Sequence, residues 1–353
     1  MRAWDETEAA LRRGAAQRAA DDAATLDALA NEGIALDPVT PATHRHGDHE
    51  HASDHVHPRT HSAPGERPVV GIVGAGSVGL VLGIALDRAG WPVGAAASRD
   101  PARRERFRER VPRARVFAEA NALVDEVELI ILAVPDDALA TVAGTLRLYA
   151  GQALVHTSGL LGAEVLDPAM AAGTQAGAFH PLVAFADPER ALAALAGATI
   201  AIEGDDGLAA HLADMAEAIG AVPVRLAPGT KAAYHAAAVL AAGGVVALLD
   251  TIREAAAATG LDEAGTLAIY LPLLEQTVAN ARAIGIAAAL TGPATRGDAG
   301  TIAAHLAALR ADAPDAIPVY RALLERSVGI AAARGAITAE TAARLRTALA
   351  ANP

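Results

Sequence analysis

The chain has 353 residues, of which 52% are apolar when alanine is counted and only 3% are aromatic. This length corresponds to about two domains, and the formal net charge of −12 disfavours general binding to the nucleic-acid backbone. The absence of cysteine excludes disulfides, thiolate metal sites and a cysteine nucleophile. The first residues lack the apolar run of a signal peptide, and the longest apolar stretch, residues 236–249, is too short to cross a membrane. We therefore expect a cytoplasmic protein with no membrane partner.

Residues 1–66 differ in composition from the rest of the chain. Seven of the twelve histidines occur here, at positions His44, His46, His49, His51, His55, His57 and His61. A segment with so few large apolar side chains cannot bury enough surface to fold, which predicts a disordered extension. Its histidines are either a metal-capture sequence or the incidental metal affinity of a disordered tail. Because no spacing fixes a closed coordination shell, we favour the second interpretation and predict no metal site.

A different pattern begins at Arg67 and continues to residue 228. The run at residues 67–73 is rich in β-branched residues, which is typical of a strand buried on both faces of a parallel sheet. Further apolar runs lie at residues 92–98, 128–135, 152–159, 175–185, 198–204 and 222–228, with segments of helical composition between them. Strands that alternate with helices predict an α/β fold, a Rossmann-type doubly wound and mostly parallel sheet.

Beyond residue 228 the strand patterns stop. Residues 229–353 are rich in alanine and leucine, with breaks near residues 260, 292, 314 and 335. This composition predicts an all-helical domain of five or six helices. Because a long apolar stretch such as residues 236–249 requires a cover, we also expect a homodimer.

The first predicted strand leads into a glycine-rich loop. Gly74, Gly76 and Gly79 form the pattern G-x-G-x-x-G, interleaved with Ala75, Ser77 and Val78, and a helical segment follows. In dinucleotide-binding domains the first glycine makes a tight turn, the second lets the backbone approach the pyrophosphate, and the third allows the helix to pack on the strand. The alternative is a glycine-rich turn without a ligand, but the strand before the loop and the helix after it favour a dinucleotide.

The end of the second strand indicates which dinucleotide is bound. NAD enzymes usually place an acidic residue here, about 20 residues beyond the loop. This strand instead ends in Ser98 and Arg99, with Arg103 and Arg104 one turn further. Asp100 follows too late in the chain to hold the ribose 2′-hydroxyl. A hydroxyl and a guanidinium suit a 2′-phosphate. An ordinary basic helix start is the alternative, although arginines there oppose the helix dipole. The sequence therefore predicts NADP(H).

Three polar loops follow predicted strands and should meet at one edge of the sheet. The first contains Val134 and Pro135, expected to border the nicotinamide; the second contains Ser158; the third contains His180. In a doubly wound sheet this edge faces the cofactor. We therefore expect Ser158 and His180 to line a substrate cleft.

Taken together, these residues resemble a known family that joins a Rossmann-like NADP-binding domain to domain of unknown function 2520. The resemblance spans about residues 67–345 and includes Gly74–Gly79, His156–Gly159, His180–Leu182 with Phe185, Lys231–His235, and Leu290–Asp298 with His305. The family is similar to 6-phosphogluconate dehydrogenase, pyrroline-5-carboxylate reductase and ketopantoate reductase. The resemblance implies a C-terminal domain like that of 6-phosphogluconate dehydrogenase and NADPH-dependent reduction of a small 2-oxo acid such as ketopantoate.

The start of the helical region supplies two candidate catalytic residues. Lys231 is the only lysine in the chain, and His235 lies four residues later, on the same helix face. Reduction of a ketone develops negative charge on oxygen, which a lysine can stabilise or protonate. The alternatives are a surface lysine at a helix start and a core histidine bonded to a backbone carbonyl.

A glycine- and proline-containing loop supplies two further candidates, Arg296 and Asp298. A guanidinium on such a loop suits a substrate carboxylate, and the resemblance implies that the loop borders the substrate site; Arg296 paired with Asp298 is the alternative. The chain departs from the family at Ala241–Gly244, where relatives often have an asparagine. This departure favours a non-catalytic NADP-binding sensor as one alternative function. An imine reductase similar to pyrroline-5-carboxylate reductase is the other.

Overall fold

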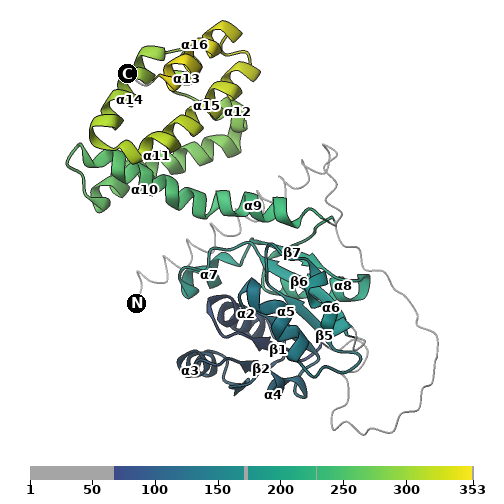
Figure 1. Cartoon of the computed structure of the whole chain (residues 1–353). Helices are drawn as coiled ribbons and strands as arrows, with labels where there is room; N and C mark the ends of the chain where they lie inside the picture. The colour runs from purple at the N-terminus through teal and green to yellow at the C-terminus, as the bar shows by residue number, and fades with distance from the viewer. Residues whose placement is uncertain (1–66, 171–173, 228, 352–353) are drawn as a thin grey trace, which may run out of the picture. The chain divides into compact units, whose positions relative to one another are not determined.

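The computed structural model describes residues 67–170, 174–227 and 229–351 (Figure 1). The predicted extension at residues 1–66, with its clustered histidines, lies outside the described residues. The chain divides into two compact units, the first ending at Ala238 and the second beginning at Val239. This division falls within helix α9 (Lys231–Ala241), whereas the sequence placed the domain border just before that helix.

The first unit is built on one eight-stranded sheet in the order β3-β2-β1-β4-β5-β6-β7-β8. All neighbouring strands are parallel except β6 and β7, which are antiparallel. The strands are β1 (Val70–Val73), β2 (Val93–Ala97), β3 (Arg115–Phe117), β4 (Leu129–Leu132), β5 (Ala153–His156), β6 (Gln175–Pro181), β7 (Thr199–Glu203) and β8 (Val222–Arg225). The order reverses between β1 and β4, which confirms the predicted doubly wound, mostly parallel sheet.

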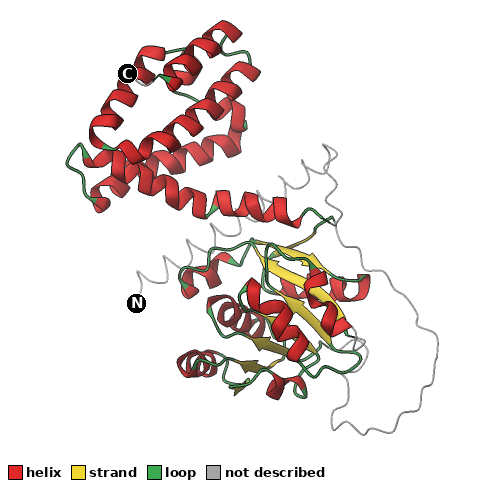
Figure 2. Cartoon of the chain, in the orientation of Figure 1, coloured by secondary structure: helices red, strands yellow, loops and turns green. Residues whose placement is uncertain are grey.

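Helices cover both faces of this sheet (Figure 2). They are α2 (Ser77–Arg88), α3 (Pro101–Arg110), α4 (Asn121–Val124), α5 (Asp136–Thr145), the 3-10 helix η1 (Ala163–Leu166), α6 (Asp167–Met170), α7 (Pro188–Ala194) and α8 (Asp206–Ala218). One apolar cluster joins the sheet to α2 and α8 through Ile72, Leu82 and Leu212. A second cluster joins the sheet to α4 and α5 and includes Ile130 of β4 and Leu139 of α5.

The predicted strands coincide with strands of the sheet, and only β3 was not predicted. This strand has three residues, of which Arg115 is exposed, and it pairs with β2 alone at the sheet edge. A short edge strand needs no continuous apolar run, so the hydrophobic pattern that identifies the buried strands is absent from it.

From Lys231 onward the described residues form eight α-helices and one 3-10 helix, rather than the predicted five or six helices. After α9 these are α10 (Gly243–Ala257), α11 (Glu263–Ile284), α12 (Ile286–Ala289), α13 (Pro293–Arg296), α14 (Ala299–Asp312), η2 (Pro314–Ala316), α15 (Ile317–Ala333) and α16 (Ala339–Ala350). The predicted breaks are present, and the chain also breaks at Ala242 and at Gly285, which has a φ of +82°. The core of this unit lies among α13–α16 and includes Ile302, Val328 and Leu345.

Helices α10 and α11 contribute little to that core. Val246, Leu273 and Val278 are 67%, 59% and 60% exposed. Residues Lys231–Ala257, which span α9 and α10, are the one stretch of the described chain that is long and apolar enough to cross a membrane, judged by length and composition alone, and the apolar part is not buried. Residues 236–249, which are too short to cross a membrane alone, form the middle of this stretch, and the chain breaks within it at Ala242.

Candidate functional site

A cleft of about 680 Å³ lies at the carboxyl ends of β1, β2 and β4. This is the point where the strand order reverses, at which ligands bind in open α/β sheets. The residues predicted from the sequence that line the cleft are Gly74, Gly76, Ser98, Arg99, Val134 and Pro135. Arg103, Glu119 and Thr141 also line it.

The glycines of the loop meet different steric demands. Gly74 has a φ of +101°, and a Cβ there would lie 2.3 Å from the carbonyl oxygen of Ala133. A Cβ on Gly79 would lie 2.0 Å from the carbonyl oxygen of Gly74, so only glycine lets α2 pack this closely. At Gly76 the nearest atom is 3.6 Å away, on Arg103. Gly76 thus presents open backbone to the cleft, at a helix N-terminus without a side-chain cap, where N–H groups can bind an anion.

The residues between the glycines contribute to packing more than to the cleft. Ala75 is buried and Val78 packs against the same core cluster, whereas Ser77 is exposed at the first position of α2. None of these three residues lines the cleft.

The loop after β2 carries the predicted phosphate-binding groups. The Arg104 guanidinium donates to the carbonyl oxygens of Ser98 and Arg99 at 2.7 and 3.0 Å, which fixes the loop. The Asp100 carboxylate caps α3 and also pairs with Arg103, 3.3 Å from its Nε. This carboxylate offsets the unfavourable effect of arginines on the helix dipole, so the dipole argument for an anion is weaker than the sequence indicated.

Hydrogen bonds join the three polar segments that the sequence placed at one sheet edge, although His180 lies within strand β6 and not in the predicted loop. The Ser158 hydroxyl donates to Asp136 Oδ2 at 2.8 Å, and His180 Nδ1 donates to the carbonyl oxygen of Thr157 at 2.9 Å. The Ser158 oxygen also accepts hydrogen bonds from the backbone N–H groups of Leu160 and Leu161. Its donor and both lone pairs are therefore used, so Ser158 braces the loop and has no group left for a substrate.

Two histidines of the site are held neutral by burial. His156 is fully buried, and desolvation, with a smaller effect of Lys231, lowers its pKa to about 4. Its Nδ1 accepts from the Ser158 N–H, so Nε2 carries the hydrogen and donates to the carbonyl oxygen of Gly162 at 3.0 Å. Burial also lowers the pKa of His180. Because Nδ1 of this neutral ring donates to Thr157, Nε2 is left as a hydrogen-bond acceptor.

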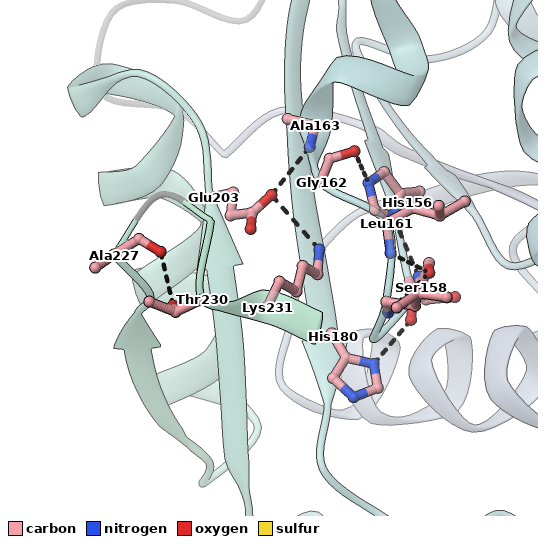
Figure 3. Close-up of polar contacts among 12 residues, drawn as sticks. His156, Ser158, Leu161, Gly162, Ala163, His180, Glu203, Ala227, Thr230 and Lys231 are labelled. Carbon is pink, nitrogen blue, oxygen red and sulfur yellow. Dashed lines mark hydrogen bonds and ion pairs between the residues drawn. The ribbon is translucent and has the colours of Figure 1, made fainter. Parts of the chain in front are cut away.

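Lys231 is buried, with 5% of its surface exposed, which excludes the alternative of a surface lysine. Its Nζ lies 3.5 Å from Glu203 Oε2, an oxygen that also accepts a hydrogen bond from the Ala163 N–H at 3.0 Å (Figure 3). Desolvation lowers the pKa of Lys231, and the Glu203 carboxylate opposes that effect. The site thus contains an ammonium group that is almost entirely removed from water.

Three buried polar atoms on the first turn of α9 lack a hydrogen-bond partner among the described residues: Lys231 Nζ, Tyr234 Oη and His235 Nδ1. His235 is half-buried, and no hydrogen bond from its ring to a backbone carbonyl is found in the part of the chain that the structure describes, unlike the alternative of a core histidine. A Cβ on Gly159 would lie 2.3 Å from His235 Nδ1 and 2.8 Å from His180 Nε2, so a larger residue would displace one of these rings. Unpartnered buried polar atoms are costly, and a ligand that pairs with them would remove the cost.

The other predicted substrate residues lie in the second unit. Asp298 caps α14 and accepts hydrogen bonds from the Thr301 N–H and hydroxyl at 2.9 and 2.6 Å, which lower its pKa. Arg296 is exposed at the end of α13, and no ion pair joins it to Asp298 in the described chain. His305 Nδ1 lies 2.8 Å from the Tyr320 hydroxyl. The binding of a carboxylate by Arg296 remains a prediction from the sequence.

Glu203, Tyr234 and Gly159 are residues of the site that had no predicted role. Tyr234 and Gly159 lie inside motifs that the sequence singled out, so their position was a usable signal. Glu203 is the last residue of β7, and its place in the site depends on the antiparallel pairing of β7 with β6. Local sequence contains no signal for that pairing.

The reversed strand order, the glycine loop and the cleft at the carboxyl edge define a Rossmann-type domain, which a helical unit follows. Comparison with protein families agrees. The Rossmann-like domain family matches residues 57–181, and the family described as domain of unknown function 2520 matches residues 198–327. The first match covers most of the sheet, and the second covers its last strands and much of the helical region. A comparison with curated proteins gave no match.

Several solved structures share the fold. A Bacteroides fragilis protein assigned as an NADP oxidoreductase is 23% identical, with a TM-score of 0.60 over 74% of this chain and 98% of its own. Protein TM1727 from Thermotoga maritima is 26% identical, with a TM-score of 0.59 over 76% of this chain and 100% of its own. A reductive aminase from Aspergillus terreus, in complex with NADPH and ethyl-5-oxohexanoate, is 16% identical, with a TM-score of 0.57 over 80% and 99%.

Proposed function

We propose that this protein is an NADP(H)-dependent oxidoreductase that reduces a small 2-oxo acid, with ketopantoate as the leading candidate substrate. The observation that carries the proposal is the buried Lys231, whose Nζ has no hydrogen-bond partner among the described residues, beside the unpartnered Tyr234 and His235. Support for the cofactor comes from the cleft at the glycine loop and from the neighbours, one assigned as an NADP oxidoreductase and another solved with NADPH.

The cleft residues fit the parts of the cofactor. The open backbone at Gly76 and the start of α2 would hold the pyrophosphate. Ser98 and Arg99 would hold the 2′-phosphate, and Val134 and Pro135 would border the nicotinamide half. When bound, the reduced nicotinamide supplies a hydride to the substrate.

Residues of the first unit would then stabilise the charge that develops on the substrate and donate a proton to it. Reduction of a carbonyl group places negative charge on its oxygen, which the buried Lys231 ammonium stabilises and protonates. Burial lowers the pKa of Lys231, which makes proton donation easier. His180 and His235 would hydrogen-bond polar groups of the substrate and fix its orientation.

An imine reductase is the second candidate. The carboxylates of Glu203, Glu164 and Asp136 all act on the charge of Lys231. The same carboxylates would stabilise a protonated imine bound beside Lys231, because the imine carries positive charge. Two neighbours support this candidate: a reductive aminase from Aspergillus terreus and an imine reductase from Pseudomonas sp..

The test is NADPH oxidation by the purified full chain with a panel of 2-oxo acids, ketopantoate included, and cyclic imines. Turnover of 2-oxo acids supports the proposal, and turnover of imines alone supports the second candidate. Tight NADPH binding without turnover of either class indicates a non-catalytic sensor. If neither NADPH nor NADH changes the protein fluorescence or melting temperature, the proposal is wrong.

A variant pair connects turnover to the site. Lys231→Met should reduce kcat by about 100-fold or more, because it removes both the charge and the proton donor, and it should leave NADPH affinity unchanged. Arg326→Met removes an exposed cation on α15 and is the matched control. Equal kcat values for the two variants would exclude a catalytic role for Lys231.

A further inference from the structure

Glu203 is a charged group of the site that the proposed reaction does not use. It is the last residue of β7, and its side chain is 22% exposed, beside a Lys231 side chain that is 7% exposed. The two charged atoms are 3.5 Å apart. Because water screens a pair this well buried only weakly, the carboxylate has a large effect on the ammonium.

The sheet fixes the backbone of Glu203 beside the site. Glu203 pairs with Ala178 on β6, and Ala178 pairs with His156 on β5, so the three residues lie in one row across the sheet. A Cβ on Gly177 would lie 2.4 Å from the carbonyl oxygen of Glu203, so the glycine permits this close approach. The position of the carboxylate is thus set by strand pairing.

The side chain of Glu203 is held as well. Its Oε2 accepts a hydrogen bond from the Ala163 N–H, at the start of η1 (Figure 3). The neighbouring Gly162 carbonyl accepts a hydrogen bond from His156. The carboxylate therefore connects Lys231 to the loop that also carries Ser158 and Gly159.

The geometry of the ion pair leaves the ammonium hydrogens available. At 3.5 Å the contact with Glu203 balances charge and engages at most one of the three N–H donors of Lys231. No other partner of Nζ is found among the described residues. Charge balance and a free donor are what a group needs if it is to bind or protonate a ligand in a buried site.

We propose that Glu203 is a positioning residue, which holds the side chain of Lys231 in place as a charged ammonium group. The inference rests on the proposed function, because it concerns the residue assigned to the reaction. Other groups that act on Lys231 are Glu164 on η1, Asp136 at the start of α5, His156 on β5 and His180 on β6. The two histidines are neutral, and Glu203 is the only one of these groups that forms an ion pair with Lys231 in the described chain.

The single lysine of the chain permits a direct test without substrate or cofactor. Protein grown with lysine labelled with ¹³C at Cε gives one lysine signal, that of Lys231, whose chemical shift can be followed against pH. Glu203→Gln removes the charge that favours the ammonium form and should raise its acid dissociation constant by about 10-fold or more. Glu325→Gln, which removes the partner of Arg346 on α16, is the control and should leave the constant unchanged.

Glu203→Asp is the second variant. It keeps the charge but is shorter by one methylene, so its effect should be in the same direction and smaller. If Glu203→Gln does not fold, as judged from its amide spectrum, Glu203→Asp still tests the contact. An unchanged dissociation constant in the folded Glu203 variants would overturn the inference.

Activity measurements distinguish this inference from the proposed function. In an active enzyme, Glu203→Gln should shift the basic limb of the kcat–pH profile to lower pH, in step with the titration of Lys231. If the lysine titration responds to Glu203 but no substrate is reduced, the proposed reaction fails and the ion-pair inference stands. If substrates are reduced but the titration does not respond, the inference alone fails.

Discussion

At the scale of single residues, His156 links burial to the pH dependence of stability. Its pKa is about 4 in the folded chain and 6.5 in the unfolded chain. Between these values the unfolded chain takes up a proton that the folded chain does not. The free energy of unfolding should therefore fall as the pH falls from 6.5 to 4, by about 3 kcal/mol from this residue.

Urea unfolding at pH 7 and at pH 4.5 checks this expectation. His156→Gln removes the titrating group and keeps a donor toward the Gly162 carbonyl, so stability should change less between the two pH values than in the wild type. His211→Gln, at an exposed position on α8, should behave like the wild type. An equal loss of stability in all three proteins would show that His156 does not contribute.

Arg99 is the residue on which the choice between NADPH and NADH depends. Arg99→Ala should raise KM for NADPH by about 10-fold or more, because a charged hydrogen bond to the 2′-phosphate is lost, and it should change KM for NADH little. Arg106→Ala, at an exposed position on α3 outside the cleft, is the control. Equal effects of Arg99→Ala on the two cofactors would refute the assignment.

At the scale of elements, two glycines at the start of α2 have different predicted roles, Gly79 in stability and Gly76 in cofactor binding. Gly79→Ala should lower the free energy of unfolding by about 2–3 kcal/mol, because its Cβ would meet the Gly74 carbonyl oxygen at 2.0 Å. A Cβ at Gly76 has space, so Gly76→Ala should lower the free energy of unfolding by about 1 kcal/mol or less. It should still weaken NADPH binding, because the methyl group would lie between the backbone and the pyrophosphate.

Urea unfolding and fluorescence titration with NADPH measure the two effects in the same proteins. Loss of NADPH affinity in Gly76→Ala at nearly wild-type stability would support a backbone contact with the cofactor. Unchanged affinity in this variant would show that the cofactor does not approach Gly76.

At the scale of the whole molecule, the exposed apolar side chains of α10 and α11 need a cover. Val246, Ile269 and Leu273 are each more than half exposed. Large apolar surfaces of this kind mark interfaces, and we expect a second copy of the chain to bind here. Light scattering should give twice the chain mass of 35.6 kDa.

Substitutions on these helices test the expected dimer. Val246→Glu combined with Leu273→Glu should shift the protein toward the mass of one chain. Thr347→Glu, at an exposed position on α16, should not change the mass. A wild-type protein that has the mass of one chain at micromolar concentration would contradict the prediction.

The sequence by itself determined most of the sheet and the glycine loop. Buried parallel strands require continuous apolar runs, and the tight turn before α2 requires glycine, so each left a local signal. The breaks near residues 260, 292, 314 and 335 were also predicted from glycine and proline, whereas those at Ala242 and Gly285 were not. The sequence did not predict β3, a short edge strand, or the one-turn helices α12 and α13. Elements of three or four residues are too short to show a periodic hydrophobic pattern.

Only the tertiary structure decided the chemistry around Lys231. Burial of the lysine, the row that brings Glu203 beside His156, and the contact of Gly159 with two histidine rings all join residues that are far apart in the chain. The Ser158 hydroxyl also bonds a distant residue, Asp136, whereas Asp298 forms a local cap with Thr301. Local sequence specifies which turn or strand forms, whereas burial and charge pairing depend on which strands become neighbours and in which direction they run.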